Sequence, residues 1–387
     1  MMRQALTMAT SSSLTVFTQF DDLPVVTLPD DRFFVDTYPR TSQEFSAFCD
    51  QLKQEANAWQ DQETCSVDIV HRWCPSALPC LGCAASSRDR RPVPGTVRHR
   101  AFVDSNSKIT LSLTRPLRIG PNEWSQVWRG TMNVSSIGSE VLPPVSAVVK
   151  IFQQSFFEQP ESYAPESGIM FATWLTGAQQ ARREAWAYSL MQSLQGGEIP
   201  WSYGIFKLRL GHGELAFAHV MEFVNGRSCT QISVSDSPQA QVWALASSMA
   251  SALYKTIQCG VRHGDVRSSN IIIRQGAAHP AVFLDFAFAQ PMLPDRFSGD
   301  LNGLVFTLQA IGMAIPEIKA WFEDGIQRQA PWSELFVHQI DTVPLWWSSF
   351  EGVVPPAVLE YCSRSICGWN SPEGDFEDLF PEVEDAI

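Results

Sequence analysis

Two segments in the second half of the chain, each with a short apolar stretch beside polar residues, constrain its fold more than any other feature. HGDVRSSNIII occupies residues 263–273, and VFLDFAFA occupies residues 282–289. Their short apolar stretches predict two strands that pair as a hairpin. Asn270 precedes the first strand and Asp285 follows the second, so the hairpin would direct both side chains to one place. Their oxygens could hold Mg²⁺ there, with Asp265 beside them on a loop as a base that positions a hydroxyl group.

The composition is that of a globular protein. The chain has 387 residues, of which 45% are hydrophobic and 18% are charged. This length can bury one large domain or two ordinary ones, with extensions. The formal net charge of −13 argues against a nucleic-acid partner, because phosphate binding needs clustered Lys and Arg.

The sequence also bears on location. The first twenty residues contain no sustained apolar segment of the kind found in a signal peptide, and no run of eighteen apolar residues occurs that could span a membrane. The nine Cys are an odd number, which favours reduced thiols inside the cell. We therefore expect an intracellular protein, cytoplasmic or nuclear, with no membrane partner.

The order of the local patterns predicts an α+β chain in two lobes. Residues 41–62 have the capping pattern of a helix, and the basic, Pro-containing residues 84–100 are typical of a linker. Short β-branched runs follow, and helical patterns then dominate. The expected divisions are an extension with one helix and a Cys-containing loop (1–100), a main domain (101–345) and a C-terminal segment with an acidic tail (346–387).

The segment around Asp265 resembles the catalytic loop and metal-binding segment of the protein-kinase-like superfamily. Those segments read His-x-Asp-x-x-x-x-Asn, followed by Asp-Phe-Gly. This chain has His263, Asp265 and Asn270, and Asp285-Phe286-Ala287 begins fifteen residues after Asn270. The resemblance implies a two-lobed protein-kinase-like fold, with a small β-rich N-lobe over residues 101–225 and a helical C-lobe over residues 226–345.

Residues 117–130, LRIGPNEWSQVWRG, resemble a glycine-rich nucleotide loop. Gly120 has the place of the first glycine, and Val127 has that of the valine that covers adenine. Asn122 and Ser125 stand where further glycines are usual, so the loop amides would approach phosphates less freely. A glycine-containing hairpin without a ligand is the alternative.

Residues 146–152, SAVVKIF, resemble the strand that carries the phosphate-binding lysine, here Lys150. A lysine in such an apolar strand needs a partner if it is buried. Residues 181–194 supply one, because Glu184 lies at the margin of an apolar helical stripe. The resemblance implies that Lys150 and Glu184 form an ion pair that orients the phosphates. A solvent-facing lysine on an edge strand is the alternative.

Residues 214–226, ELAFAHVMEFVNG, resemble the hinge beside adenine. The resemblance assigns adenine recognition to the carbonyl of Glu222 and to the backbone of Val224. It also assigns Val148 and Ile272 to the nucleotide site.

Other positions agree with or depart from this pattern. Asp300 resembles the aspartate that braces the catalytic loop, with a simple helix N-cap as the alternative. Arg267 stands where a lysine commonly contacts the γ-phosphate, a role that Arg can also perform. Gly264 replaces the arginine that many protein kinases have before the catalytic aspartate. Only fourteen residues separate Asp285 from Asp300, too few for an ordinary activation segment.

A Cys-rich segment upstream allows two interpretations. It contains Cys65, His71, Cys74, Cys80 and Cys83, the last two in a CxxC turn. Tetrahedral Zn²⁺ could bind there, but the spacing matches no standard finger. Buried structural thiols are the preferred interpretation.

The sequence therefore predicts an enzyme, an ATP-dependent phosphotransferase of protein-kinase type that uses Mg²⁺. Its preferred acceptor is a Ser or Thr hydroxyl group of a protein. The His-Gly-Asp form and the short activation segment also suit a small-molecule kinase of the same superfamily. The altered glycine-rich loop suits a nucleotide-binding pseudokinase scaffold. The oligomeric state stays open.

Overall fold

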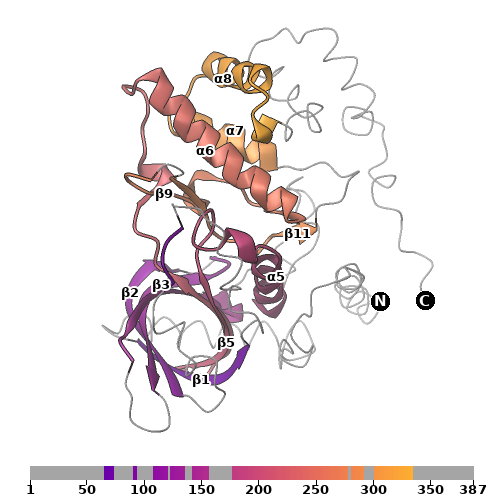
Figure 1. Ribbon diagram of the computed structural model, residues 1–387. Helices are drawn as coiled ribbons and strands as arrows, with labels where there is room; N and C mark the ends of the chain where they lie inside the picture. The colour runs from indigo at the N-terminus through magenta and orange to yellow at the C-terminus, as the bar shows by residue number, and fades with distance from the viewer. Residues whose placement is uncertain are drawn as a thin grey trace, which may run out of the picture.

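The computed structural model describes residues 65–73, 90–93, 108–120, 123–135, 142–156, 177–277, 280–291 and 300–333. Within these ranges a β-barrel occupies one end of the molecule and a group of helices occupies the other (Figure 1). In these ranges no helix combines the length and the apolar character needed to cross a membrane.

Six antiparallel strands close the barrel in the order β1-β2-β3-β4-β6-β5. Their bounds are Cys65–Trp73 (β1), Lys108–Arg118 (β2), Gln126–Ser135 (β3), Val145–Phe152 (β4), Ser202–Leu210 (β5) and Leu215–Glu222 (β6). Every second residue of β3 is buried, as expected for a strand with one face toward the barrel interior. That interior is apolar and includes Leu113, Met132, Val149, Leu208 and Val220.

The closed barrel shows that the predicted fold class, a two-lobed protein-kinase-like fold with a small β-rich N-lobe and a helical C-lobe, is wrong. β1 pairs with β2 through Val67 and Leu111, and with β5 through Val67 and Leu210. Without β1, the free edges of β2 and β5 would expose unpaired backbone N–H and C=O groups. β1 satisfies both edges at once, although it lies in residues that the sequence analysis assigned to a Cys-containing loop.

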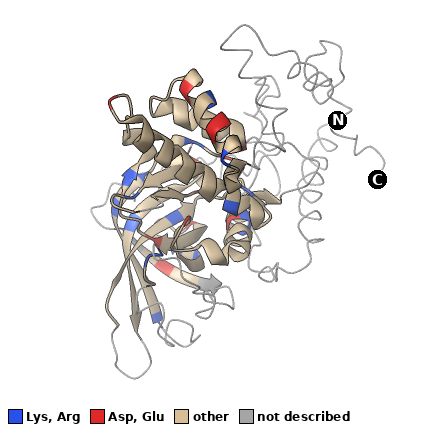
Figure 2. Cartoon of the chain, turned by 45° about the horizontal axis from the view of Figure 1, so that its top comes forward, with Lys and Arg blue, Asp and Glu red and all other residues tan. Residues whose placement is uncertain are grey.

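The helices divide between the two ends of the molecule. α5 (Gly177–Leu190) packs on the outside of the barrel against β4, β5 and β6. α6 (Gln239–Gln258), α7 (Asp300–Ala310) and α8 (Ile315–Gln327) form the other end (Figure 1). They bury a second apolar core that includes Met249, Leu253, Leu304, Leu308 and Trp321. Acidic residues of α8 lie at the end of the molecule away from the barrel (Figure 2).

Short elements connect the barrel to these helices. The strands are Arg227–Ser228 (β7), Val261–Arg262 (β8), Ile271–Ile273 (β9), Ala281–Phe283 (β10) and Gln290–Pro291 (β11). The 3₁₀ helices are Gln154–Phe156 (η2), Gln192–Leu194 (η5), Cys229–Gln231 (η6), Ser268–Asn270 (η7) and Pro331–Ser333 (η8). β9 and β10 pair antiparallel, with Ile272 opposite Val282, so the predicted hairpin is confirmed.

Arg91, within the segment expected to be a linker, is held against the turn before β5 and the end of β6. Its backbone N–H donates to the carbonyl of Gly196 at 2.8 Å. Its guanidinium donates to the carbonyls of Gly197 and Ile199, each at 2.9 Å, and its Nε lies 2.5 Å from Glu222 Oε1. Four partners of this kind hold the residue more firmly than a flexible connection requires.

Several sequence predictions concern residues outside the described ranges. The helix over 41–62, the acidic tail and the thiols of Cys74, Cys80 and Cys83 lie there. Cys65 and His71 lie within β1, so the backbone of this part of the Cys-rich segment is extended.

Candidate active site

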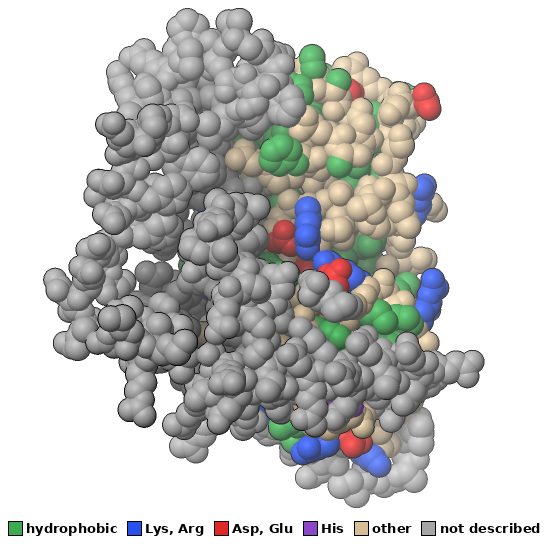
Figure 3. All heavy atoms as spheres, turned by 180° about the vertical axis from the view of Figure 1, so that it is seen from behind, with side chains coloured by type: hydrophobic (Ala, Val, Ile, Leu, Met, Phe, Trp, Pro, Cys, Tyr) green, Lys and Arg blue, Asp and Glu red, His purple; other side chains and the backbone are tan. Residues whose placement is uncertain are grey.

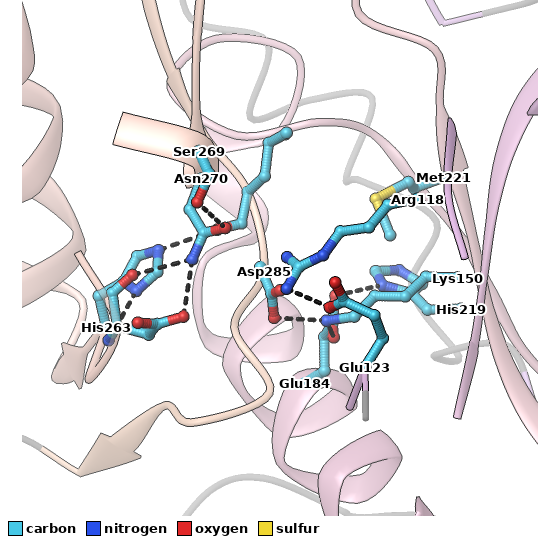
Figure 4. Close-up of polar contacts among 12 residues, drawn as sticks. Arg118, Glu123, Lys150, Glu184, His219, Met221, His263, Ser269, Asn270 and Asp285 are labelled. Carbon is cyan, nitrogen blue, oxygen red and sulfur yellow. Dashed lines mark hydrogen bonds and ion pairs between the residues drawn. The ribbon is translucent and has the colours of Figure 1, made fainter. Parts of the chain in front are cut away.

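Three side chains that the sequence assigns to the site come from distant segments and form one cluster of ion pairs, called the ion triad below. Lys150 Nζ on β4 lies 2.5 Å from Glu184 Oε2 on α5 and 2.5 Å from Asp285 Oδ1 just beyond β10 (Figure 4). The side chains of Lys150 and Glu184 are 4% and 0% exposed, and that of Asp285 is 19% exposed. The predicted contact between Lys150 and Glu184 is confirmed, and Asp285 shares it.

The charges of this triad stabilise one another. Burial by itself lowers the pKa of Lys150, but the neighbouring charges of Asp285 and Glu184 raise it above its ordinary value. Burial by itself raises the pKa of Asp285, but the charge and hydrogen bond of Lys150 bring it below its ordinary value. Both shifts favour the charged forms. Asp285 also has a φ of 66°, a strained conformation for a residue with a Cβ, and such strain is often found at functional sites.

His219 is a buried partner of the triad that the sequence analysis missed. Its Nδ1 lies 3.0 Å from Glu184 Oε1, and its Nε2 lies 2.8 Å from Ser202 Oγ. Lys150 and His219 are opposite each other in the pairing of β4 with β6, so both face the glutamate from the same part of the barrel. Each oxygen of the Glu184 carboxylate therefore has its own partner. The available signal was a single polar residue within the apolar run of β6.

Asp265 and Asn270 form a second group beside the triad. Asn270 Nδ2 donates to Asp265 Oδ2 at 2.8 Å and to the Asp265 carbonyl at 3.0 Å. Both amide hydrogens of Asn270 are thus directed at Asp265. Its Oδ1 accepts a long hydrogen bond from Ser269 Oγ at 3.5 Å and is the atom of this side chain suited to a cation. Arg267 Nε lies 3.1 Å from Asp265 Oδ2. Burial raises the pKa of Asp265, although the charge of Arg267 opposes this shift, so the carboxyl is a better proton acceptor than an ordinary aspartate.

Asp300 supports this loop from the first turn of α7, as predicted. Its carboxylate accepts hydrogen bonds from the backbone N–H groups of His263 at 2.7 Å and Gly264 at 2.8 Å. His263 Nε2 lies 2.9 Å from the carbonyl of Leu284, and its Nδ1 accepts from the N–H of Asp265 at 3.2 Å. The loop and the segment that carries Asp285 are therefore fixed relative to each other.

Position 264 accepts only glycine, for steric and conformational reasons. Its φ is 78°, and a Cβ at this position would lie 2.3 Å from the carbonyl oxygen of Phe288. Any residue other than glycine would be strained in this conformation and would also collide with backbone.

We expect Gly264→Ala to destabilise the fold by at least about 2 kcal/mol, measured as a lower urea midpoint. Gly276→Ala is the matched control, because Gly276 has a φ of 71° but no atom within 4 Å of a Cβ. The control should lose only the stability that a positive φ costs a residue with a Cβ. Equal losses for the two variants would show that the contact with Phe288 contributes nothing.

The residues expected around a nucleotide base lie on the barrel and the hairpin. Val127 and Lys150 are opposite each other in the pairing of β3 with β4, and Val148 lies on β4 two residues before Lys150. Ile272 lies in β9, opposite Ser228 of the segment that follows β6. Gly120 lies two residues after the end of β2.

The structure places the two residues of the expected hinge at the end of β6. Glu222 is the last residue of that strand, and Val224 is buried just beyond it. The Glu222 carboxylate accepts from the Trp201 N–H at 3.0 Å and pairs with Arg91, so the side chain is committed to structure. Only its backbone carbonyl could take the role expected for it.

Magnesium suits the donors present. Among the described residues no group of three or more His, Cys, Asp or Glu side chains could hold a metal ion. Mg²⁺ at nucleotide sites needs fewer protein ligands, because one or two carboxylates act together with phosphate oxygens and water. Asp285 and the Oδ1 atom of Asn270 are oxygen donors of this type.

Charged side chains mark this region on the surface. On the face opposite that of Figure 1, acidic and basic side chains gather at the level between the barrel and the helices (Figure 3). The side chain of Arg267 is 46% exposed and that of Asp265 is 23% exposed, so both are within reach of an incoming molecule.

The chain matches no protein-family model and no curated protein. Inferences about its function therefore rest on the residues and geometry of the site.

Proposed function

We propose that this protein is an ATP-dependent phosphotransferase of protein-kinase type that modifies a Ser or Thr hydroxyl group of a protein. The observation that carries this proposal is the convergence of Lys150, Glu184 and Asp285 from three distant segments. Asn270 lies beside them (Figure 4), and its side-chain amide donates to Asp265. A buried lysine between two carboxylates, next to a second acid and an amide, has the groups that phosphoryl transfer requires.

Each side chain has a role in this proposal. Bound Mg·ATP would supply the phosphoryl group. Lys150, oriented by Glu184, offers a cation to phosphate oxygens. Asp285 and Asn270 offer oxygen ligands to Mg²⁺. Asp265 positions the acceptor hydroxyl group and accepts its proton, and its raised pKa suits that task.

A small-molecule acceptor is the second candidate, and one observation favours it. Gln290 of β11 pairs with Arg262 of β8, so the chain returns against β8 only five residues after Asp285. Little of this segment is then left to form a platform for a peptide.

We further propose that the protein acts inside the cell, in the cytoplasm or nucleus. Cys229 and Cys259 are free thiols, which fits a reducing compartment.

Asp285→Asn tests the nucleotide site directly. We expect Mg·ATP to raise the melting temperature of the wild-type protein and to leave the variant almost unchanged, because the variant lacks the charged metal ligand. Asp236→Asn changes an exposed aspartate outside the site and serves as the control. Equal stabilisation of all three proteins by Mg·ATP would remove Asp285 from the site.

The acceptor can be identified by phosphoryl transfer from labelled ATP to a protein library and to a metabolite library. Transfer to proteins supports the first candidate, and transfer to metabolites alone supports the second. Nucleotide binding without any transfer would instead indicate a nucleotide-binding scaffold.

A further inference from the structure

In the loop between β2 and β3, the backbone amide of Gly120 already has a hydrogen-bond acceptor within the protein. Gly120 N–H donates to Gln126 Oε1 at 2.8 Å, and Gln126 Nε2 donates to the Gly120 carbonyl at 3.0 Å. The Gln126 side chain is fully buried at the start of β3 and Gly120 is half-buried, so this double hydrogen bond is partly shielded from water. An amide that already has a buried acceptor is a poor ligand for an anion.

A cation takes a position beside this loop. Arg118 is the last residue of β2, and its side chain extends from the barrel toward Asp285 (Figure 4). Its guanidinium pairs with the carboxylate of Glu123, at the other end of the loop. The side chains of Arg118 and Glu123 are 38% and 31% exposed, so both remain within reach of a ligand.

Electrostatics place Arg118 within the field of the candidate site. Burial by itself lowers its pKa, but the hydrogen bond and charge of Glu123, together with the charges of Asp285 and Asp265, raise it above the ordinary value. The guanidinium is thus attracted by the same carboxylates that face the ligand.

The loop is also held against the segment that follows Asp285. The rings of Trp124 and Phe288 make an edge-to-face contact with centroids 5.8 Å apart. This contact and the hydrogen bonds of Gln126 hold the described part of the loop at two points. Arg118 therefore approaches the site from a supported position, which reduces the entropy lost on binding.

We propose that Arg118 binds the phosphate chain of the nucleotide, in place of the Gly120 amide, and that Glu123 holds the guanidinium in position until the ligand binds. This inference rests on the proposed function and deepens it. A guanidinium can bind two phosphate oxygens at once, and it keeps its charge at any physiological pH. The ligand class is a nucleoside di- or triphosphate, with Glu123 exchanged for phosphate oxygens on binding.

Binding measurements on four proteins test the proposal: wild type, Arg118→Ala, Glu123→Gln and the control Arg115→Ala. Arg115 is exposed on the same strand and has the same charge. The probes are Mg·ATP, Mg·ADP and adenosine. Arg118→Ala should weaken the affinity for Mg·ATP by about tenfold to a hundredfold, as expected for a charge-assisted hydrogen-bonded pair. It should change the affinity for adenosine by less than about twofold, because adenosine has no phosphate.

Glu123→Gln should leave the affinity for Mg·ATP unchanged or increase it, because a competing carboxylate has been removed. Equal weakening of Mg·ATP by Arg118→Ala and Arg115→Ala would reduce the effect to general surface charge and overturn the proposal. If Arg118→Ala weakened the affinities for Mg·ATP and adenosine equally, the proposal would also be overturned, since Arg118 would then only maintain the loop. In both cases the proposed function survives. If the wild type bound none of the three probes, both the Arg118 proposal and the proposed function would be overturned.

Discussion

Lys150→Met is expected to destabilise the protein by about 3–5 kcal/mol at neutral pH, because it leaves the buried Glu184 and the partly buried Asp285 without their cation. Lys150 Nζ lies 2.5 Å from one oxygen of Glu184 and 2.5 Å from one oxygen of Asp285. Methionine has a similar length and flexibility, so the variant loses mainly the charge. Urea unfolding measures the loss. Lys108→Met is the matched control, since Lys108 is exposed on a strand of the same barrel.

The loss should also depend on pH. In the wild type, the contribution of Asp285 disappears only when the pH falls through its lowered pKa, below 3.8. That of Lys150 disappears only when the pH rises through its raised pKa, above 10.5. Asp285 and Lys150 therefore contribute constant stability from about pH 5 to pH 8. Without Lys150, burial raises the pKa of Asp285, so the folded variant binds more protons than the unfolded chain. Its stability then falls as the pH rises, and the gap to the wild type widens.

A second variant keeps this test decisive if the first one unfolds. Lys150→Met combined with Asp285→Asn removes one charge of each sign, and Glu184 keeps its contact with His219. The double variant should recover part of the stability that Lys150→Met loses. A loss for Lys150→Met that equals the loss for Lys108→Met and does not change with pH would show that the triad is not a coupled buried unit.

The contact between Lys150 and Glu184 was expected from the resemblance of their segments to those of a known superfamily, whereas the ion pair between Lys150 and Asp285 was not predicted. The apolar run before Lys150 and the helical stripe around Glu184 each fix an element type. The spacing between Asn270 and Asp285 fixes a hairpin, and the pairing of β9 with β10 brings both to one side. Local periodicity was sufficient for the type of each element, but it does not determine which side chains from different elements meet.

The fold class could not be predicted in this way, because barrel closure depends on a pairing between distant strands. β1 ends at Trp73, and β2 begins at Lys108, so nothing in the local pattern joins them. The Cys and His residues of β1 are typical of a metal site, whereas the buried Val67 is typical of a strand in a barrel wall. Strand pairing is decided by the free edges of the other strands, which a single segment does not contain.

The residues that the local sequence patterns did not reveal were overlooked for one physical reason. His219 and Arg91 each pair with a residue that is distant in the sequence, and each stands in a segment whose local pattern is complete without it. His219 lies in an apolar strand, and Arg91 lies in a basic stretch that resembled a linker. A polar residue that interrupts an apolar run is the one signal that would have identified His219, because a buried polar group requires a partner.

Asp265→Asn is expected to reduce phosphoryl transfer by about a hundredfold to ten-thousandfold, the usual effect of losing a general base. Stability and Mg·ATP affinity should stay close to those of the wild type. Asparagine keeps an oxygen that can accept from Asn270 Nδ2, which lies 2.8 Å from Asp265 Oδ2, so the loop geometry can persist. The contact with Arg267 would lose its charge, but both side chains are partly exposed, so little stability depends on it.

The pH profile distinguishes a base from a residue that only supports the loop. Asp265 acts as a base when it is deprotonated, and burial raises its pKa above the ordinary 3.8. Transfer by the wild type should therefore fall on the acid side as the pH drops through this raised pKa, and the residual activity of Asp265→Asn should lack that limb. The exposed Asp236→Asn variant should keep the wild-type profile. An Asp265→Asn variant with full activity, or with an unchanged acid limb, would exclude Asp265 as the base and return that role to another group in the site.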